Sequence, residues 1–203
     1  MHNQNKVGTI VIVGGVPGVG KTTVINETLR LAKNNNFPLE HIVYGTVMMD
    51  IAKSDYDVEN RDQLRKLPPL TQKAIQRQAA KKIASQSIGK TVIVDTHFAV
   101  KTKTGAFLVG IPRWVVDELP PQLLVLIETK PRNILKRRGK DVNRHRDKDS
   151  IDLLHDHQDI NRAMAAGISQ QTGSLLTVVE NYPGKAREAA ENLLGQIQAL
   201  IIK

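Results

Sequence analysis

The stretch Gly-Val-Pro-Gly-Val-Gly-Lys-Thr-Thr, residues 15–23, directly follows an apolar run at residues 7–13. Its spacing, a glycine, four residues, then glycine, lysine and threonine, is that of a loop that binds nucleotide phosphates between a strand and a helix. The β-branched run before it predicts a buried strand, and residues 22–33 carry the apolar stripe of a helix. The motif therefore stands in the setting that its chemistry requires.

Each residue type in this loop has a physical role. Glycines let backbone N–H groups turn inward around phosphate oxygens, and the start of the helix adds a partial positive charge. We expect Lys21 to reach the β and γ phosphates of a nucleoside triphosphate and the Thr22 hydroxyl to bind the accompanying Mg²⁺. The expected nucleotide-binding residues are Gly15, Val16, Pro17, Gly18, Val19, Gly20, Lys21, Thr22 and Thr23.

Length and composition predict a single domain. The chain has 203 residues, 40% of them hydrophobic, which suits one substantial core with a small insertion. It has no cysteine, so disulfides and thiolate metal sites are excluded, and we expect a cytoplasmic protein. No run approaches the roughly 18 apolar residues of a membrane span, and the first residues lack the apolar core of a signal peptide.

Short apolar runs alternate with helical patterns along the whole chain. A short strand is expected at 41–44, and strands buried on both faces are expected at 91–94, 123–127 and 175–179. This order predicts an α/β fold, a parallel sheet of about five strands with helices on both faces. In the amphipathic helix expected at 70–83, the basic stripe of Lys73, Arg77 and Lys81 is expected to be solvated.

Asp95 ends the apolar run at 91–94. A carboxylate at the end of a strand beside a phosphate-binding loop can hold Mg²⁺ or its water shell. The alternative is that Asp95 caps a turn or a helix. Its pairing with the glycine-rich loop favours the metal role, through water.

Much of the net charge of +9 lies in one segment. Residues 136–148 hold seven basic and two acidic residues, so 7 − 2 = +5. Phosphoryl transfer depends on positioning and on neutralising charge, and arginine forks supply both. We therefore interpret the segment as an arginine-rich flap. It contains no aromatic residue on which bases could stack, which disfavours RNA binding, and an exposed charged loop is the remaining alternative.

The order of several motifs resembles the archaeal-type adenylate kinases. The likeness runs from about residue 7 to the carboxyl end and is carried by residues 15–23, 44–49, 61–67, 72–76, 94–97 and 161–162. The resemblance implies a P-loop NTPase architecture in one domain, residues 1–203, with an acceptor flank at about 44–86 and a small lid at about 137–149. It also implies reversible, Mg²⁺-dependent phosphoryl transfer from ATP to AMP giving two ADP, in a cytoplasmic homotrimer. Neither nucleic acid nor membrane is an expected partner.

The resemblance also assigns roles to individual residues. The catalytic residues it implies are Lys21, Arg137, Arg144, Arg146 and Arg162, and those binding AMP are Gly45, Thr46 and Arg65. His97 follows Asp95 by two residues at a strand end, and from that position we expect it to bind AMP. His97 can equally be a hydrogen-bonded structural histidine. His155 and His157 are two apart on a helix, so a metal shared between them is not expected. Residues 105–112 depart from the family pattern, which usually has a tyrosine and a proline there.

Overall fold

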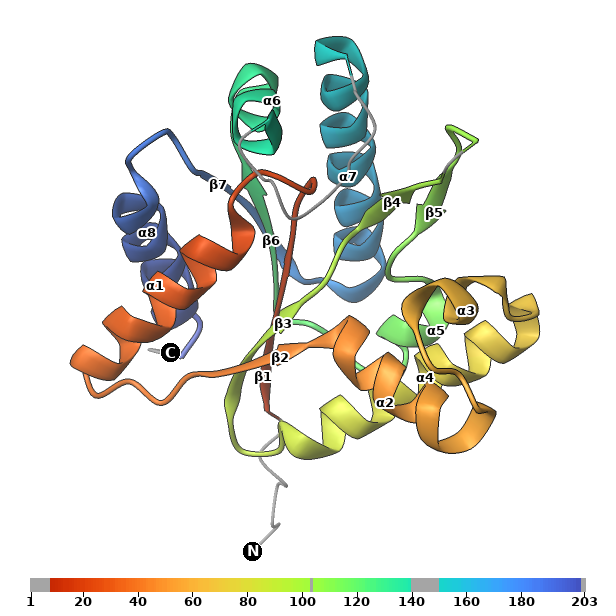
Figure 1. Ribbon diagram of the computed structural model, residues 1–203. Coiled ribbons are helices and arrows are strands. Elements are labelled where there is room, and N and C mark those ends of the chain that lie inside the picture. Colours follow the sequence, from red (N-terminus) through yellow and green to blue (C-terminus); the bar gives the residue numbers. More distant parts are fainter. Residues whose placement is uncertain (1–7, 103, 140–149, 202–203) are drawn as a thin grey trace, which may run out of the picture.

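Five parallel strands form the central sheet of the computed structural model, which describes residues 8–102, 104–139 and 150–201 (Figure 1). Their order is β2-β3-β1-β6-β7. Their bounds are Thr9–Gly14 for β1, Glu40–Val43 for β2, Thr91–Asp95 for β3, Leu123–Glu128 for β6 and Leu175–Glu180 for β7. The predicted parallel sheet of about five strands is thus confirmed.

Helices cover both faces of the sheet, as the alternation of patterns predicts. Figure 1 shows α1 and α8 on one side and α2 to α5 with α7 on the other. Their bounds are Lys21–Asn34, Tyr44–Tyr56, Arg61–Lys66, Pro69–Gln86, Arg113–Val116, Pro131–Gly139, Ile151–Thr172 and Ala186–Ala199 for α1 to α8. No helix in the described ranges is long and apolar enough to cross a membrane.

Two apolar cores result from the alternation of side chains along each strand. On β1, Val11 and Val13 belong to the core under α1 and α8, and Ile10 and Ile12 belong to the core on the opposite face. All four are almost fully buried. The near-continuous apolar runs are therefore explained by a sheet that is covered on both sides.

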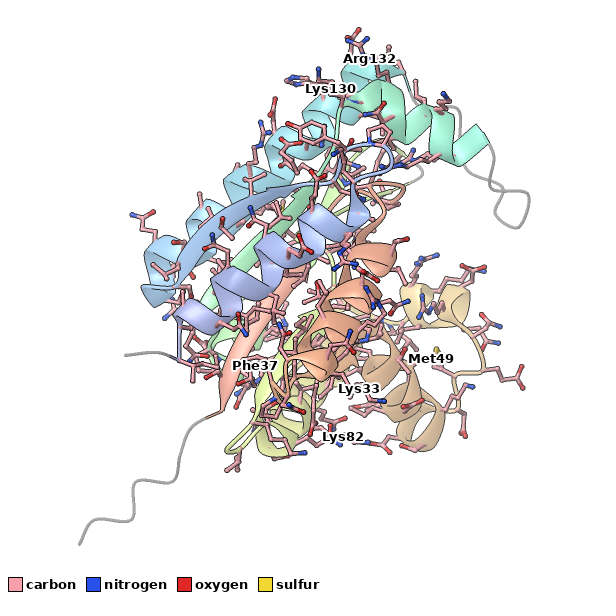
Figure 2. The ribbon with its side chains drawn as sticks, turned by 90° about the vertical axis from the view of Figure 1, so that its left-hand side faces the viewer. Lys33, Phe37, Met49, Lys82, Lys130 and Arg132 are labelled. Atoms are coloured by element: carbon pink, nitrogen blue, oxygen red, sulfur yellow. The ribbon has the colours of Figure 1, made fainter. Side chains whose placement is uncertain are left out.

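The sheet order brings the carboxyl ends of β1 and β3 together. Val13 pairs with Asp95 in the register of these strands, and the glycine-rich loop leaves β1 one residue later. Ligands in open α/β sheets bind outside the carboxyl ends of the strands. In Figure 2 this end lies uppermost, where Lys130 and Arg132 mark the start of α6, while Lys33 and Phe37 mark the far end of α1.

The prediction that residues 175–179 form a strand buried on both faces is wrong. Residue Leu175 is 60% exposed, and of the six residues of β7 only Val179 is buried. The reason is position, because β7 is the last strand of the sheet and pairs only with β6. An apolar run alone does not distinguish a central strand from an edge strand.

Residues 99–109 form a hairpin that the sequence patterns do not predict. Strand β4, Ala99–Lys101, pairs antiparallel with β5, Phe107–Val109. The hairpin is bound to α7, because Asn161 Oδ1 accepts a hydrogen bond from the Ala99 N–H at 3.2 Å. The departure at residues 105–112 therefore lies in an ordered element beside α7.

The pattern of α4 predicts a solvated basic stripe, but in the structure its cations also contact other side chains. Arg77 donates to Glu118 Oε1 at 3.2 Å through Nε, and Lys81 Nζ lies 3.7 Å from the same oxygen. The Lys73 ammonium lies 4.8 Å from the centre of the Trp114 ring, within range of a cation–π contact. All three cations face the region of α5, which closes this side of the core.

Candidate active site

The turn between β1 and α1 has the conformation that its glycines predict. Gly20 precedes α1 with φ of 86°, a left-handed conformation that favours glycine. A Cβ atom there would lie 2.5 Å from Asn181 Nδ2. No side chain caps α1, and its first turn holds no acidic residue. The first N–H groups of α1 are therefore available to an anion.

Backbone carbonyls of this turn are held by three side chains. Arg137 Nη1 and Asn181 Nδ2 donate to Val19 O at 2.6 and 2.8 Å, and Arg138 Nε donates to Pro17 O at 2.9 Å. Donors that hold the carbonyls outward favour a loop whose N–H groups face inward. Arg137, predicted to be catalytic, binds the loop backbone here, and its Nη2 also donates to Asn181 O at 3.0 Å.

Lys21 and Asp95 meet at the mouth of this loop. The Lys21 ammonium forms an ion pair with Asp95 Oδ1, and Asp95 is 8% exposed. Burial lowers the pKa of Lys21 to about 8, while the carboxylate beside it favours the charged form. Thr22 is exposed in the first turn of α1. One carboxylate and one hydroxyl beside a phosphate loop are donors that fit Mg²⁺, which keeps several water ligands.

His97 is tied to the same loop. Its Nδ1 lies 3.1 Å from Gly15 O, so this nitrogen carries the hydrogen and Nε2 is left as an acceptor. Burial, followed by the charge of Lys21, lowers the pKa of His97 to about 4. The imidazole is therefore neutral near pH 7. The contact gives His97 a structural role, and its predicted role in binding AMP stays a prediction.

The predicted acceptor residues Gly45 and Thr46 form the first turn of α2. Val43 precedes this helix without a capping side chain, and the first turn holds no acidic residue. Arg61 Nη2 lies 3.9 Å from the position of a Cβ on Gly45, and its charge contributes to the lowered pKa of His97. Arg61 therefore faces the same region as these residues.

Arg65 and Arg61 are one turn apart on α3 and both are exposed, yet their neighbours differ. The Arg65 side chain is 69% exposed, and its Nη1 donates to Asp62 Oδ1 at 3.1 Å. Arg65 is among the AMP-binding residues predicted from the sequence, whereas Arg61 is not. The signal that could have found Arg61 is its i, i+4 spacing from Arg65, which places both on one side of the helix.

The Arg162 guanidinium is bound by Glu128 in this structure. Both its Nε and its Nη2 donate to the buried Glu128 at the end of β6, the first at 2.9 Å. The pair borders a hollow of about 180 Å³ between β6, α7 and the end of β7, with His155 and Tyr182 on its wall. Binding of a phosphate by Arg162 would require this guanidinium to leave Glu128.

Two other groups of predicted residues have plain outcomes. Arg144 and Arg146 lie outside the described residues. The His155 ring pairs with Asp159 at 3.0 Å, whereas His157 is buried with its Nε2 3.3 Å from Ala99 O. In the parts of the chain that the structure describes, no group of three or more His, Cys, Asp or Glu could hold a metal ion.

Comparison with known families places this architecture among nucleotide-binding domains. Residues 14–155 match a family model described as an AAA domain. The match begins in the last residue of β1, extends through the glycine-rich loop and Asp95, and ends in the first turns of α7.

Curated relatives match nearly the whole chain. The adenylate kinase of Methanopyrus kandleri is 40% identical over 196 residues, which cover 96% of this chain and all of the relative. That of Methanocaldococcus jannaschii is 41% identical, with 94% of this chain and 97% of the relative covered. That of Methanoculleus marisnigri is 42% identical over 95% of this chain and all of the relative.

Proposed function

This chain belongs to the adenylate kinase family and transfers a phosphoryl group between ATP and AMP. We propose that the transfer requires Mg²⁺ and takes place between the glycine-rich loop and α2. The observation that carries the proposal is the buried Lys21–Asp95 pair beside an uncapped helix start. A cation and a carboxylate at the carboxyl ends of β1 and β3 are what binding and transfer of a polyphosphate require.

On the donor side, we assign phosphate binding to residues 15–23. The N–H groups at the start of α1 bind the phosphate oxygens, and Lys21 exchanges Asp95 for the β and γ phosphates. Thr22 and, through water, Asp95 would hold Mg²⁺, which neutralises charge on the migrating phosphoryl group. Lys21 is poised for this exchange because its ammonium already lies at the mouth of the loop, beside Asp95.

On the acceptor side, we propose that AMP lies along α2. Gly45 and Thr46 supply the N–H groups of an uncapped helix start, Arg61 and Arg65 supply positive charge, and His97 borders the site. Arg61 is supported by its place beside Gly45, and Arg65 by the family resemblance. Together they would orient the AMP phosphate toward the γ phosphate of ATP.

Arginines of the lid at about 137–149 complete the proposal. Arg144 and Arg146 would close over the phosphates and exclude water. Closure of this kind is a general property of adenylate kinase lids. Arg137 would contribute from the base of the lid, where it already contacts the loop. Arg162 would join the site once phosphate competes with Glu128 for its guanidinium.

Assembly and location are proposals from the resemblance and composition. We propose a cytoplasmic homotrimer, and the absence of cysteine suits that reducing compartment. Light scattering at micromolar concentration is expected to give three times the chain mass, and a monomer would contradict the assembly. Neither nucleic acid nor membrane belongs to the proposed set of partners, which is ATP, AMP and ADP.

A coupled assay with ATP and each nucleoside monophosphate tests the function. We expect transfer to AMP, dependent on added Mg²⁺ and lost in the presence of a chelator. Lys21→Met, which removes the charge that acts on the phosphates, provides the inactive control. Absence of transfer to any monophosphate, together with salt-sensitive RNA binding, would instead support RNA binding by the basic segment at residues 136–148.

A further inference from the structure

Asp95 has a second neighbour besides Lys21. His41 lies on β2, where it pairs in register with Ile93, two residues before Asp95 on β3. Side chains two residues apart on a strand share a face, so His41 and Asp95 both point toward the face covered by α1. Ile93 belongs to the core on that face, which confirms the direction.

The two oxygens of the Asp95 carboxylate face different nitrogens. Oδ1 pairs with the Lys21 ammonium, whereas Oδ2 lies 3.7 Å from His41 Nε2. That separation is too long for a hydrogen bond. Among the described residues, His41 Nε2 and Asn181 Oδ1 are the buried side-chain nitrogen and oxygen atoms without a hydrogen-bond partner. A buried polar atom without a hydrogen-bond partner costs free energy of folding. The position of His41 Nε2 beside Asp95 therefore suggests a functional role.

We propose that His41 is a positioning residue, which donates from Nε2 to Asp95 Oδ2 when nucleotide draws Lys21 away. The inference rests on the proposed function, in which Lys21 exchanges Asp95 for phosphate. Asp95 is nearly buried, and a buried carboxylate that loses its cation needs other donors. A hydrogen bond to Oδ2 would fix the carboxylate plane and direct Oδ1 toward the water shell of Mg²⁺.

Three substitutions at position 41 separate this role from simple packing. His41→Leu removes the donor and keeps an apolar side chain of similar bulk. His41→Gln carries an amide nitrogen at the reach of Nε2, whereas the amide of His41→Asn reaches only as far as Nδ1. Rescue by Gln but not by Asn is the signature of a donor at a defined distance. His155→Leu on the exposed face of α7 is the matched control.

Calorimetry of ATP binding with and without Mg²⁺ provides a readout other than activity. We expect metal-free ATP affinity to change less than about twofold in all variants. The gain in affinity on adding Mg²⁺ should fall about tenfold in His41→Leu and His41→Asn, the size expected for a hydrogen bond to a charged group. His41→Gln and His155→Leu should retain that gain. The turnover number should follow the same order, with the KM for AMP unchanged.

Asp95→Asn distinguishes failure of the inference from failure of the proposed function. If Asp95→Asn loses the increase in ATP affinity on adding Mg²⁺ and His41→Leu retains it, Asp95 helps to bind the metal and the proposed role of His41 is overturned. If Asp95→Asn also retains the gain, the proposed metal role of Asp95 is wrong, and the inference is overturned with it. Circular dichroism melting must be native-like in His41→Gln, and rescue in that folded variant is the supporting result.

Discussion

At the scale of single residues, burial lowers the pKa of Lys21 enough for its ammonium to lose its proton at mildly alkaline pH. Its pKa is lowered to about 8, so in the free enzyme the ammonium is charged below that pH and loses its proton above it. Charge on Lys21 is needed for phosphate binding, and kcat/KM reports the free enzyme. We predict that kcat/KM for ATP is flat below about pH 8 and falls about tenfold per pH unit above it.

The kcat profile provides the internal control for this prediction. Bound phosphates favour the charged form of Lys21, so kcat should hold to a higher pH than kcat/KM. His97 should cause no change in either pH profile near pH 7, because its pKa is about 4. A kcat/KM for ATP that stays level to pH 9.5 would show that Asp95 keeps Lys21 charged.

Arg61 and Arg65 offer a paired test of the acceptor site. Both side chains are exposed, but Arg61 lies beside Gly45, whereas Arg65 is paired with Asp62. We predict that Arg61→Ala raises the KM for AMP about 30-fold or more, because an arginine–phosphate pair in a closed site is worth about 2–5 kcal/mol. Arg65→Ala should raise it less. Steady-state kinetics with either substrate varied would measure both effects, and a larger effect on ATP in Arg61→Ala would move Arg61 to the donor side.

At the scale of elements, the turn between β1 and α1 favours glycine at position 20. Gly20 and Gly89 both have positive φ, but a Cβ would strike Asn181 at Gly20 and nothing within 4 Å at Gly89. We predict that Gly89→Ala costs about 1–2 kcal/mol of unfolding free energy, from backbone strain alone. Gly20→Ala should cost more unfolding free energy. It should also weaken ATP binding by about 10²-fold, because the backbone N–H groups of the turn no longer point at the phosphates.

Urea unfolding and calorimetry measure the two consequences for Gly20→Ala and Gly89→Ala side by side. Normal ATP affinity in Gly20→Ala would mean that the turn adapts without losing its phosphate-binding shape. Equal losses of stability would mean that Asn181 moves aside at no cost.

The lid is the second element whose role can be tested by substitution. Arg144 and Arg146 lie outside the described residues, so this prediction rests on charge and on family resemblance. Changing both to Ala should lower transfer by about 10²-fold, on the order of 3 kcal/mol, while ATP binding through residues 15–23 changes much less. Calorimetry beside turnover measurements gives both values. A parallel collapse of ATP affinity would show ground-state binding instead of closure.

At the scale of the whole molecule, we propose that one sheet makes both cores a single folding unit. Leu123 and Leu124 are adjacent on β6 and fully buried, but they belong to opposite cores. We predict that Leu123→Ala and Leu124→Ala each cost about 2–5 kcal/mol and leave one cooperative transition.

The single tryptophan makes this test specific. Trp114 packs against the core that contains Leu124, on the face opposite Leu123. In Leu123→Ala, Trp114 fluorescence and far-ultraviolet circular dichroism should therefore shift to the same lower urea midpoint. Separate midpoints would divide the molecule into two units.

Local sequence determined the elements that carry the chemistry. The glycine spacing at residues 15–23, the β-branched runs before it and before Asp95, and the helical stripe after it are short-range patterns with short-range causes. The parallel α/β fold, the phosphate-binding turn and the position of Asp95 at a strand end therefore followed from residues close in the chain. For the same reason, the roles predicted for Lys21 and Thr22 rest on short-range patterns alone.

Tertiary structure alone decided which distant residues meet. The sheet order made β7 an exposed edge, although its apolar run resembles those of the central strands. Packing tied Arg137 to Val19 and Arg162 to Glu128, and it brought Arg61 to Gly45 and His41 to Asp95. These pairs lie between about 15 and 120 positions apart, and no periodic pattern encodes them. Their meeting depends on strand order and helix packing, which arise only when the whole chain buries its two cores.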